Sequence, residues 1–170
     1  MTRRGLVAAA AVPVLAVLVL LAGCAQVEIR PPQGPLEFDL SGRIAARYGQ
    51  ESFSGNVAWR HAERADEMLL STPLGQGVAR IVREGDAVIL TTAEPKEYRA
   101  KDAESLTERV LGFRVPLEGL AQWVRGQPAP ELEARGWKVE YQDYDAQRRP
   151  TRLRVSYPGI ELRLAISEWK

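Results

Sequence analysis

The sequence FDLSGRIAARYGQESFSGNVAW, residues 38–59, alternates apolar and polar side chains in two runs. In the first run Phe38, Leu40 and Ile44 share one face, while Asp39 and Arg43 share the other. A period of two is typical of a strand with one buried face, so this stretch predicts half-buried antiparallel strands. The shared face of the second run comprises Phe53, Gly55, Val57 and Trp59.

The same alternation recurs along the chain. It is found at residues 78–82 and 87–92, and again near the C-terminus at residues 137–141, 153–157 and 160–166. These segments predict further strands on either side of a central region that has a different period.

That central region has a helical period. Asp102 can cap a helix that ends at Gly112, and a second helix is expected from Pro116 to Gly126. Both helices are short and one-sided, so we expect them to pack on the sheet. Their apolar faces comprise Ala103, Leu106 and Val110 in the first helix and Leu117, Leu120, Ala121 and Val124 in the second.

The order of strands, two helices and strands predicts a mainly β (α+β) fold. It indicates a single curved antiparallel sheet with helices over one side or one mouth. An α+β domain with a filled core fits the same pattern. The period does not distinguish a concavity filled by side chains from one left open for a ligand.

The N-terminus has the features of a secretory signal. Two arginines precede an uncharged run that ends in LAGC, residues 21–24. This ending resembles the lipobox of bacterial lipoproteins, in which the cysteine thiol is diacylated and the chain is cleaved before it. The sequence therefore predicts a cleaved signal peptide at residues 1–23 and lipidation of Cys24.

Two other interpretations of this segment stay open. The uncharged run is long enough to serve as a transmembrane anchor, although Pro13 lies at its centre. Alternatively, Cys24 is an ordinary thiol of a cleaved secretory protein. Because Cys24 is the only cysteine, no disulfide can form within the chain.

The rest of the chain is organised as a tether and one domain. Residues 24–36 contain three prolines and read as an extended lipidated tether, and residues 37–170 form a domain large enough for a substantial core. Ala25, directly after Cys24, favours the outer membrane by the rule found in enteric bacteria. The chain has 23 basic and 22 acidic residues, without the clustered positive charge expected of a nucleic-acid binder.

Residues that could carry chemistry are few. A serine or cysteine nucleophile needs a base, and the only histidine, His61, lies in a polar segment that we expect to be a solvated turn. One histidine and one cysteine do not make a zinc site. We therefore expect no enzyme activity, cofactor or metal. Two carboxylate pairs, Glu131 with Glu133 and Asp143 with Asp145, are expected to be solvated charges.

Several strings of the chain carry a family resemblance. FDLSGRIA (38–45), FSGNVAW (53–59), PLG (73–75), LGFRVPL (111–117) and WVRG (123–126) resemble the LolB family of outer-membrane lipoproteins. Their order, their spacing and the lipobox make the resemblance specific, and it extends over essentially the whole mature domain.

The resemblance implies a fold and a function. The fold would be an incomplete antiparallel β-barrel of about eleven strands with a short helical lid over an apolar cavity. The function would be that of a monomeric receptor that accepts client lipoproteins from the periplasmic carrier LolA and inserts them into the outer membrane. The receptor itself would be anchored in the inner leaflet of that membrane through Cys24.

The resemblance also implies functional residues. The turn Pro73-Leu74-Gly75 would form the loop that inserts into the membrane. Two other functions stay open, namely an accessory outer-membrane lipoprotein that binds another envelope protein without lipid transfer, and an envelope hydrolase. Apolar side chains of the two helices are candidates for the lid and the cavity lining, although ordinary packing on the sheet is equally consistent: Leu106, Val110, Leu120 and Val124.

Overall fold

The computed structural model describes residues 32, 34–94, 96–111 and 114–170. The expected signal peptide, the lipidation site Cys24 and most of the expected tether lie outside this part of the chain. Within it, no helix is both long and apolar enough to span a bilayer.

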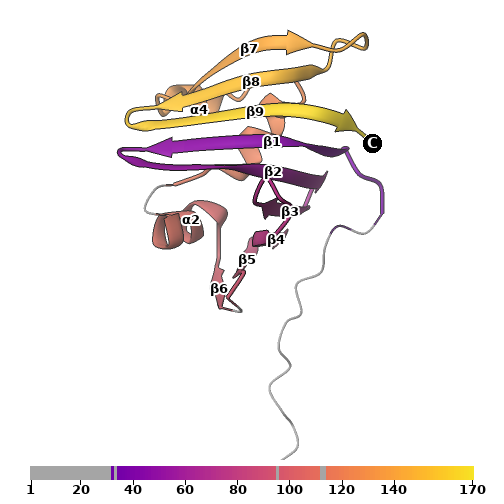
Figure 1. Ribbon diagram of the computed structural model, residues 1–170. Coiled ribbons are helices and arrows are strands. Elements are labelled where there is room, and N and C mark those ends of the chain that lie inside the picture. The colour runs from indigo at the N-terminus through magenta and orange to yellow at the C-terminus, as the bar shows by residue number, and fades with distance from the viewer. Residues whose placement is uncertain (1–31, 33, 95, 112–113) are drawn as a thin grey trace, which may run out of the picture.

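The described chain forms one antiparallel sheet of nine strands in the order β6-β5-β4-β3-β2-β1-β9-β8-β7 (Figure 1). The predicted mainly β fold with a single curved sheet is confirmed, and β6 and β7 lie at opposite edges of a sheet that does not close. The strands are β1 (Phe38–Tyr48), β2 (Glu51–Ala62), β3 (Ala65–Ser71), β4 (Gly77–Glu84), β5 (Ala87–Thr92), β6 (Glu97–Ala100), β7 (Lys138–Tyr144), β8 (Pro150–Tyr157) and β9 (Ile160–Trp169).

The strand number differs from the expectation of about eleven. The three central strands are long, with 11 residues in β1, 12 in β2 and 10 in β9, whereas strands of about five or six residues are most common. The described part of the domain therefore has fewer strands than the expected eleven, and its central strands are longer than usual.

Two glycines allow the sheet to bend sharply. A Cβ on Gly42 would clash with the backbone oxygen of Ala165, and one on Gly55 would clash with the backbone oxygen of Ser71. The β1–β9 pairing shifts register at Gly42, and the β3–β4 pairing shifts register at Ser71. Irregularities of this kind increase local twist, so the sheet curls around a concave face. Figure 1 shows β3 to β6 turned away from the long strands β1, β2, β8 and β9.

Three helices, α2 (Ala103–Leu111), α3 (Leu117–Val124) and α4 (Pro130–Ala134), follow β6 in the described chain. The two predicted helices are confirmed as α2 and α3. Asp102 caps α2, because its Oδ1 accepts a hydrogen bond of 2.7 Å from the Ser105 amide. Gly126 ends the turn after α3 with φ of 74°, while the expected stop of α2 at Gly112 lies outside the described residues. Neither α4 nor β6 was expected from the sequence.

Candidate functional site

An apolar cavity of about 500 Å³ lies between the concave face of the sheet and helices α2 and α3. The side chains of the sheet therefore do not fill its concave face. The alternation in the sequence left this question open. The apolar lining comes from six strands and from the helices: Ile44, Ala46, Phe53, Trp59, Met68, Leu70, Val78, Ala79, Ile81, Val110, Val115, Leu117, Leu120, Val124, Leu153, Val155, Leu162 and Leu164.

The cavity meets solvent at one end of the sheet, which we call the mouth end. Three exposed residues at the tip of the β1–β2 hairpin, Tyr48, Glu51 and Ser52, line it there. The mouth end also carries the β3–β4, β5–β6 and β8–β9 turns, since neighbouring strands alternate in direction. The opposite, closed end carries the β2–β3, β4–β5 and β7–β8 turns and the start of β1.

The helix residues singled out in the sequence lie at different depths. Val110 is half-buried and lines the cavity, and Leu120 and Val124 are buried and also line it. Leu106 is fully buried in the core and is not among the lining residues. Thr107 of α2 contributes a polar group to the lining, and its Oγ1 accepts a hydrogen bond of 2.8 Å from the Val115 amide.

Leu74 projects from the turn between β3 and β4. Its side chain is 91% exposed, and its neighbours Pro73 and Gly75 are exposed as well. The turn is held by backbone hydrogen bonds from the Gly75 amide to the Thr72 oxygen, 2.9 Å, and from the Thr72 amide to the Gln76 oxygen, 2.8 Å. An ordered turn at the mouth end therefore presents a large apolar side chain to solvent.

The closed end contains a buried polar group of side chains, Trp59, His61, Asp66 and Arg83, which we call the Asp66 cluster. The expectation that His61 is a solvated turn residue is wrong: its exposure is 5% and it lies in β2. Strand pairing continues to Ala62, so the turn is shorter than its polar composition suggests. His61 then points to the same face as Trp59 and stacks on Phe38, with ring centroids 4.9 Å apart.

Asp66 is the centre of this cluster and has 0% exposure. Its Oδ1 accepts hydrogen bonds from Trp59 Nε1 at 2.8 Å and from His61 Nδ1 at 2.6 Å, and its Oδ2 accepts one from Arg83 Nε at 2.6 Å. Because an ionised carboxylate only accepts, His61 carries its proton on Nδ1. Burial raises the pKa of Asp66, but the hydrogen bond and charge of His61, the charge of Arg83 and the Trp59 hydrogen bond outweigh it and hold the pKa below its ordinary value.

The Asp66 cluster also connects α3 to the sheet. Arg83 Nη1 lies 3.5 Å from a carboxylate oxygen of Glu118 in the first turn of α3. Glu37, just before β1, pairs with Arg125 at the end of α3 and lies 3.6 Å from His61 Nε2. Both ends of the helix that walls the cavity are thus linked to the closed end. His61 therefore lies between two carboxylates, with Asp66 at Nδ1 and Glu37 near Nε2, and its role in these contacts is structural.

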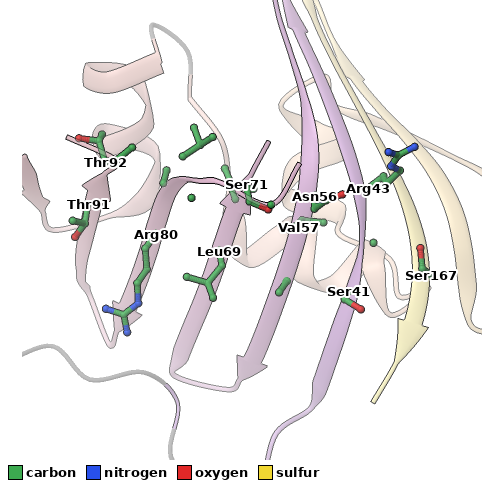
Figure 2. A pocket seen from close by; sticks show the side chains of 18 residues that line it. Ser41, Arg43, Asn56, Val57, Leu69, Ser71, Arg80, Thr91, Thr92 and Ser167 are labelled. Carbon is green, nitrogen blue, oxygen red and sulfur yellow. The ribbon is translucent and has the colours of Figure 1, made fainter. Parts of the chain in front are cut away.

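A second, larger hollow of about 970 Å³ lies on the outer face of the sheet (Figure 2). Its lining mixes polar and apolar residues of β1, β2, β3, β4, β5 and β9, and Leu69 is an exposed apolar residue among them. Arg80 is paired with Glu67 across β3 and β4 at 2.7 Å. We favour the smaller cavity as the functional site because it is apolar and covered by helices, as ligand pockets usually are.

Neither of the carboxylate pairs noted in the sequence lines the apolar cavity. Glu131, Glu133 and Asp143 are exposed, and Asp145 pairs with Arg149 of the same loop at 2.7 Å. Within the described residues there is no group of three or more His, Cys, Asp or Glu side chains that could hold a metal ion.

Comparison with known proteins identifies the relatives of this chain. Residues 36–169 match the family described as outer membrane lipoprotein LolB. Proteins named outer-membrane lipoprotein LolB are 38% identical in Thiobacillus denitrificans, covering 88% of this chain and 91% of the relative, and 36% identical in Nitrosomonas europaea, covering 92% and 91%. A LolA superfamily protein from Nitrosomonas europaea of known structure is 11% identical and covers 84% of this chain and 88% of its own, with a TM-score of 0.46.

Proposed function

Because the chain belongs to the LolB family of outer-membrane lipoproteins, we propose that its apolar cavity receives the acyl chains of client lipoproteins from the periplasmic carrier LolA and releases them into the outer membrane. The observation that carries the proposal is the cavity itself, which is lined by apolar side chains of the sheet and of two helices. In this proposal the receptor acts as a monomer, and Cys24 anchors it in the inner leaflet of the outer membrane.

The energetics of acyl chains explain the need for such a cavity. Three chains of about 16 carbons carry roughly 45 methylenes, and their exposure to water costs about 35 kcal/mol at about 0.8 kcal/mol each. Free diffusion across an aqueous compartment is therefore excluded. Transfer from one apolar cavity to another and then to a bilayer avoids that exposure. The free energy of the acyl chains therefore changes only modestly at each step, because the two environments are similar.

The volume of the cavity suits one acyl chain. A methylene group needs roughly the volume of a water molecule, about 30 Å³, so a chain of about 16 carbons needs about 480 Å³. The cavity provides about 500 Å³. In this proposal the first chain enters the resting cavity, and further chains require additional volume.

The proposed role needs no chemical step. No histidine, cysteine, aspartate or lysine is found among the described residues that line the cavity. Ser52 and its sequence neighbour Glu51 line the exposed mouth, but this lining offers no histidine to act as the base of a Ser–His pair. The transfer proceeds downhill, without a nucleotide or another cofactor.

Leu74 has a separate role in this proposal. Burial of one leucine contributes about 1.5 to 3 kcal/mol, which is small beside a triacyl anchor. The contribution of Leu74 is local: an apolar side chain at the mouth end disturbs lipid packing where the client is released. Its exposure of 91% leaves it available for that contact.

A transfer experiment tests the proposal. LolA loaded with a fluorescently labelled lipoprotein is mixed with the soluble Cys24→Ala chain without ATP, and the label is expected to move to the chain. Failure of the label to move would contradict the proposed function and would favour an accessory lipoprotein that binds another envelope protein.

A matched pair of variants tests the role of Leu74. In the lipidated protein, Leu74→Glu is expected to accept the label but to deliver little of it to vesicles. Leu69→Glu adds the same charge at the other exposed leucine, on the outer face of β3, and is expected to deliver normally. Equal delivery by both variants would remove Leu74 from the mechanism.

A further inference from the structure

We infer that the adjoining β1–β2 and β8–β9 turns, with Tyr48 and Tyr157, form a second membrane-contacting surface at the same end of the sheet as Leu74, and that its partner is the interface of a lipid bilayer. We call these two turns and two tyrosines the tyrosine rim. The inference rests on the proposed function, because it assumes that the mouth end faces a membrane.

The two ends of the sheet differ in charge. At the mouth end, the β1–β2 turn (Gly49, Gln50), the β3–β4 turn (residues 72–76) and the β8–β9 turn (Pro158, Gly159) contain no charged residue. Charges at this end lie in the β5–β6 turn, where Lys96 and Glu94 pair at 3.0 Å, and at the strand ends beside the turns, where Arg47 lies 3.9 Å from Glu161 and Glu51 is exposed.

The closed end has the opposite character. Its turns contain Glu63 and Arg64 between β2 and β3, Asp86 between β4 and β5, and residues 145–149, with one acidic and two basic side chains, between β7 and β8. Charged side chains cost more to move from water toward a membrane than uncharged side chains do. Charge therefore selects the mouth end as the end that can approach lipid.

Two of the three exposed tyrosines in the described part of the chain lie at the mouth end, and the third, Tyr144, lies at the closed end. Tyr48 and Tyr157 are each 39% exposed and flank the two uncharged turns at the mouth end. A hydrogen bond of 3.2 Å from the Gly49 amide to the Gly159 oxygen joins these turns into one surface. Tyrosine is enriched at membrane interfaces because its ring is apolar and its hydroxyl remains in the polar layer. The tyrosine rim therefore has the chemistry of an interfacial anchor.

The rim is also continuous with the cavity. Tyr48 lines the cavity where it opens. Tyr157 is held in place by Trp137, whose ring stacks on it with centroids 4.9 Å apart. Contact between the rim and a bilayer would place the opening of the cavity against lipid, so an acyl chain leaving the cavity would pass directly into the membrane.

The full-length lipidated protein offers a direct test, since Cys24 is the only native cysteine and lipidation blocks it. A single cysteine is introduced at position 48, 157 or 74, or at position 144 as the control, and labelled with an environment-sensitive fluorophore. Tyr144 is a matched control because it is an exposed tyrosine at the closed end. The protein is reconstituted into vesicles of phosphatidylethanolamine and phosphatidylglycerol that contain lipids brominated near the headgroup.

We expect fluorescence to be roughly halved by the brominated lipid at Tyr48→Cys, Tyr157→Cys and Leu74→Cys, and to be nearly unchanged at Tyr144→Cys. Quenching at Leu74→Cys alone would overturn the inference and leave the proposed function intact. Equal quenching at all four positions would also overturn it, because the membrane would then not select the mouth end. Failure of the proposed function would be seen in a different experiment, the transfer assay, in which the labelled lipoprotein would stay on LolA.

A second measurement separates contact from a change in fold. The soluble Cys24→Ala chain is sedimented with the same vesicles, alone and with the Tyr48→Ser and Tyr157→Ser substitutions combined. We expect the combined variant to bind several-fold less, and Tyr48→Trp with Tyr157→Trp to bind at least as well as the parent, since tryptophan also favours the interface. Unchanged sedimentation of the combined serine variant, with an unchanged urea midpoint, would contradict a membrane-contacting rim.

Discussion

Replacing Asp66 by asparagine is expected to be among the most destabilising single substitutions in the domain. Three N–H donors converge on the two carboxylate oxygens, at 2.8, 2.6 and 2.6 Å. An amide keeps one oxygen for two donors, but its NH₂ group then faces the Nε–H of Arg83. The guanidinium, which is 5% exposed, loses its buried counter-charge. Breaking such a buried pair costs about 3 to 5 kcal/mol.

The assay is equilibrium unfolding in urea at pH 7, followed by tryptophan fluorescence of the Cys24→Ala chain. A thermal melt of the same chain gives a second readout. At roughly 3 °C per kcal/mol for a domain of this size, a loss of about 3 to 5 kcal/mol lowers the melting temperature by about 10 to 15 °C. Glu67→Gln is the matched control, since its partners Arg80 and Arg60 are both partly exposed and such pairs contribute about 0 to 1 kcal/mol each. An Asp66→Asn cost no larger than that of the control would refute the reasoning.

The same carboxylate sets a pH dependence. The pKa of Asp66 is lower in the folded protein than its ordinary value of 3.8, so its contribution to stability is complete above that value. The contribution is lost as the pH falls from about 3.8 through the folded-state pKa. The free energy of unfolding of the parent should therefore approach that of Asp66→Asn as the pH falls below about 4. A difference between the two proteins that stays constant down to pH 2 would contradict this assignment.

Three further predictions concern the cavity, the bend of the sheet and the tether. Leu120→Trp should fill part of the cavity and lower the amount of fluorescent fatty acid bound per protein several-fold, while Tyr144→Trp on the surface should not change it. Gly55→Val should cost about 1 to 3 kcal/mol in urea unfolding, because its side chain meets backbone, and Gly77→Ala, which has open space, should cost much less. Deleting residues 27–32 leaves a tether that reaches at most about 25 Å. The tether joins the domain at the start of β1, and the length of β1 places the mouth end about 33 Å away from that point. The shortened tether could not bring the mouth end to the protein's own membrane, so delivery should fail there. Replacing residues 27–32 by a glycine-serine segment of equal length should preserve delivery.

Much of the fold follows from local sequence. The strand runs, the Asp102 cap and the turn around Leu74 are each encoded within a few residues, by alternation, by a side-chain acceptor or by proline and glycine. Strand β6 and helix α4 escaped prediction because four and five residues are too short to display a period. The number of strands depends on how far each pairing extends, which is a property of the neighbouring strands.

His61 shows where polarity misleads. It continues the inward alternation of Val57 and Trp59, and that period places it correctly inside the domain. The surrounding charged residues suggest a solvated turn, but Asp66 and Arg83 satisfy the ring and each other in the interior. A polar residue that keeps the parity of a buried strand face is therefore a signal for a buried network.

The cavity could not be derived from local sequence for a different reason. Leu106 and Val110 lie on the same face of one helix, yet only Val110 lines the cavity. Helical spacing establishes which side chains point toward the sheet. Whether they meet other side chains or an open space depends on the curvature of strands distant in sequence.

An open apolar cavity has a thermodynamic cost that helps to explain the Asp66 cluster. At about 24 cal/mol per Å³, a sealed void of this volume would cost at most about 12 kcal/mol, comparable to the whole stability of a typical domain. The sheet would lower its free energy by collapsing onto α3 unless other contacts held the two apart. Bonds at the closed end do this without occupying the cavity, since Arg83 and Glu37 tie both ends of α3 to the strands. In the proposed function, a bound acyl chain would recover part of this cost, so binding would stabilise the domain.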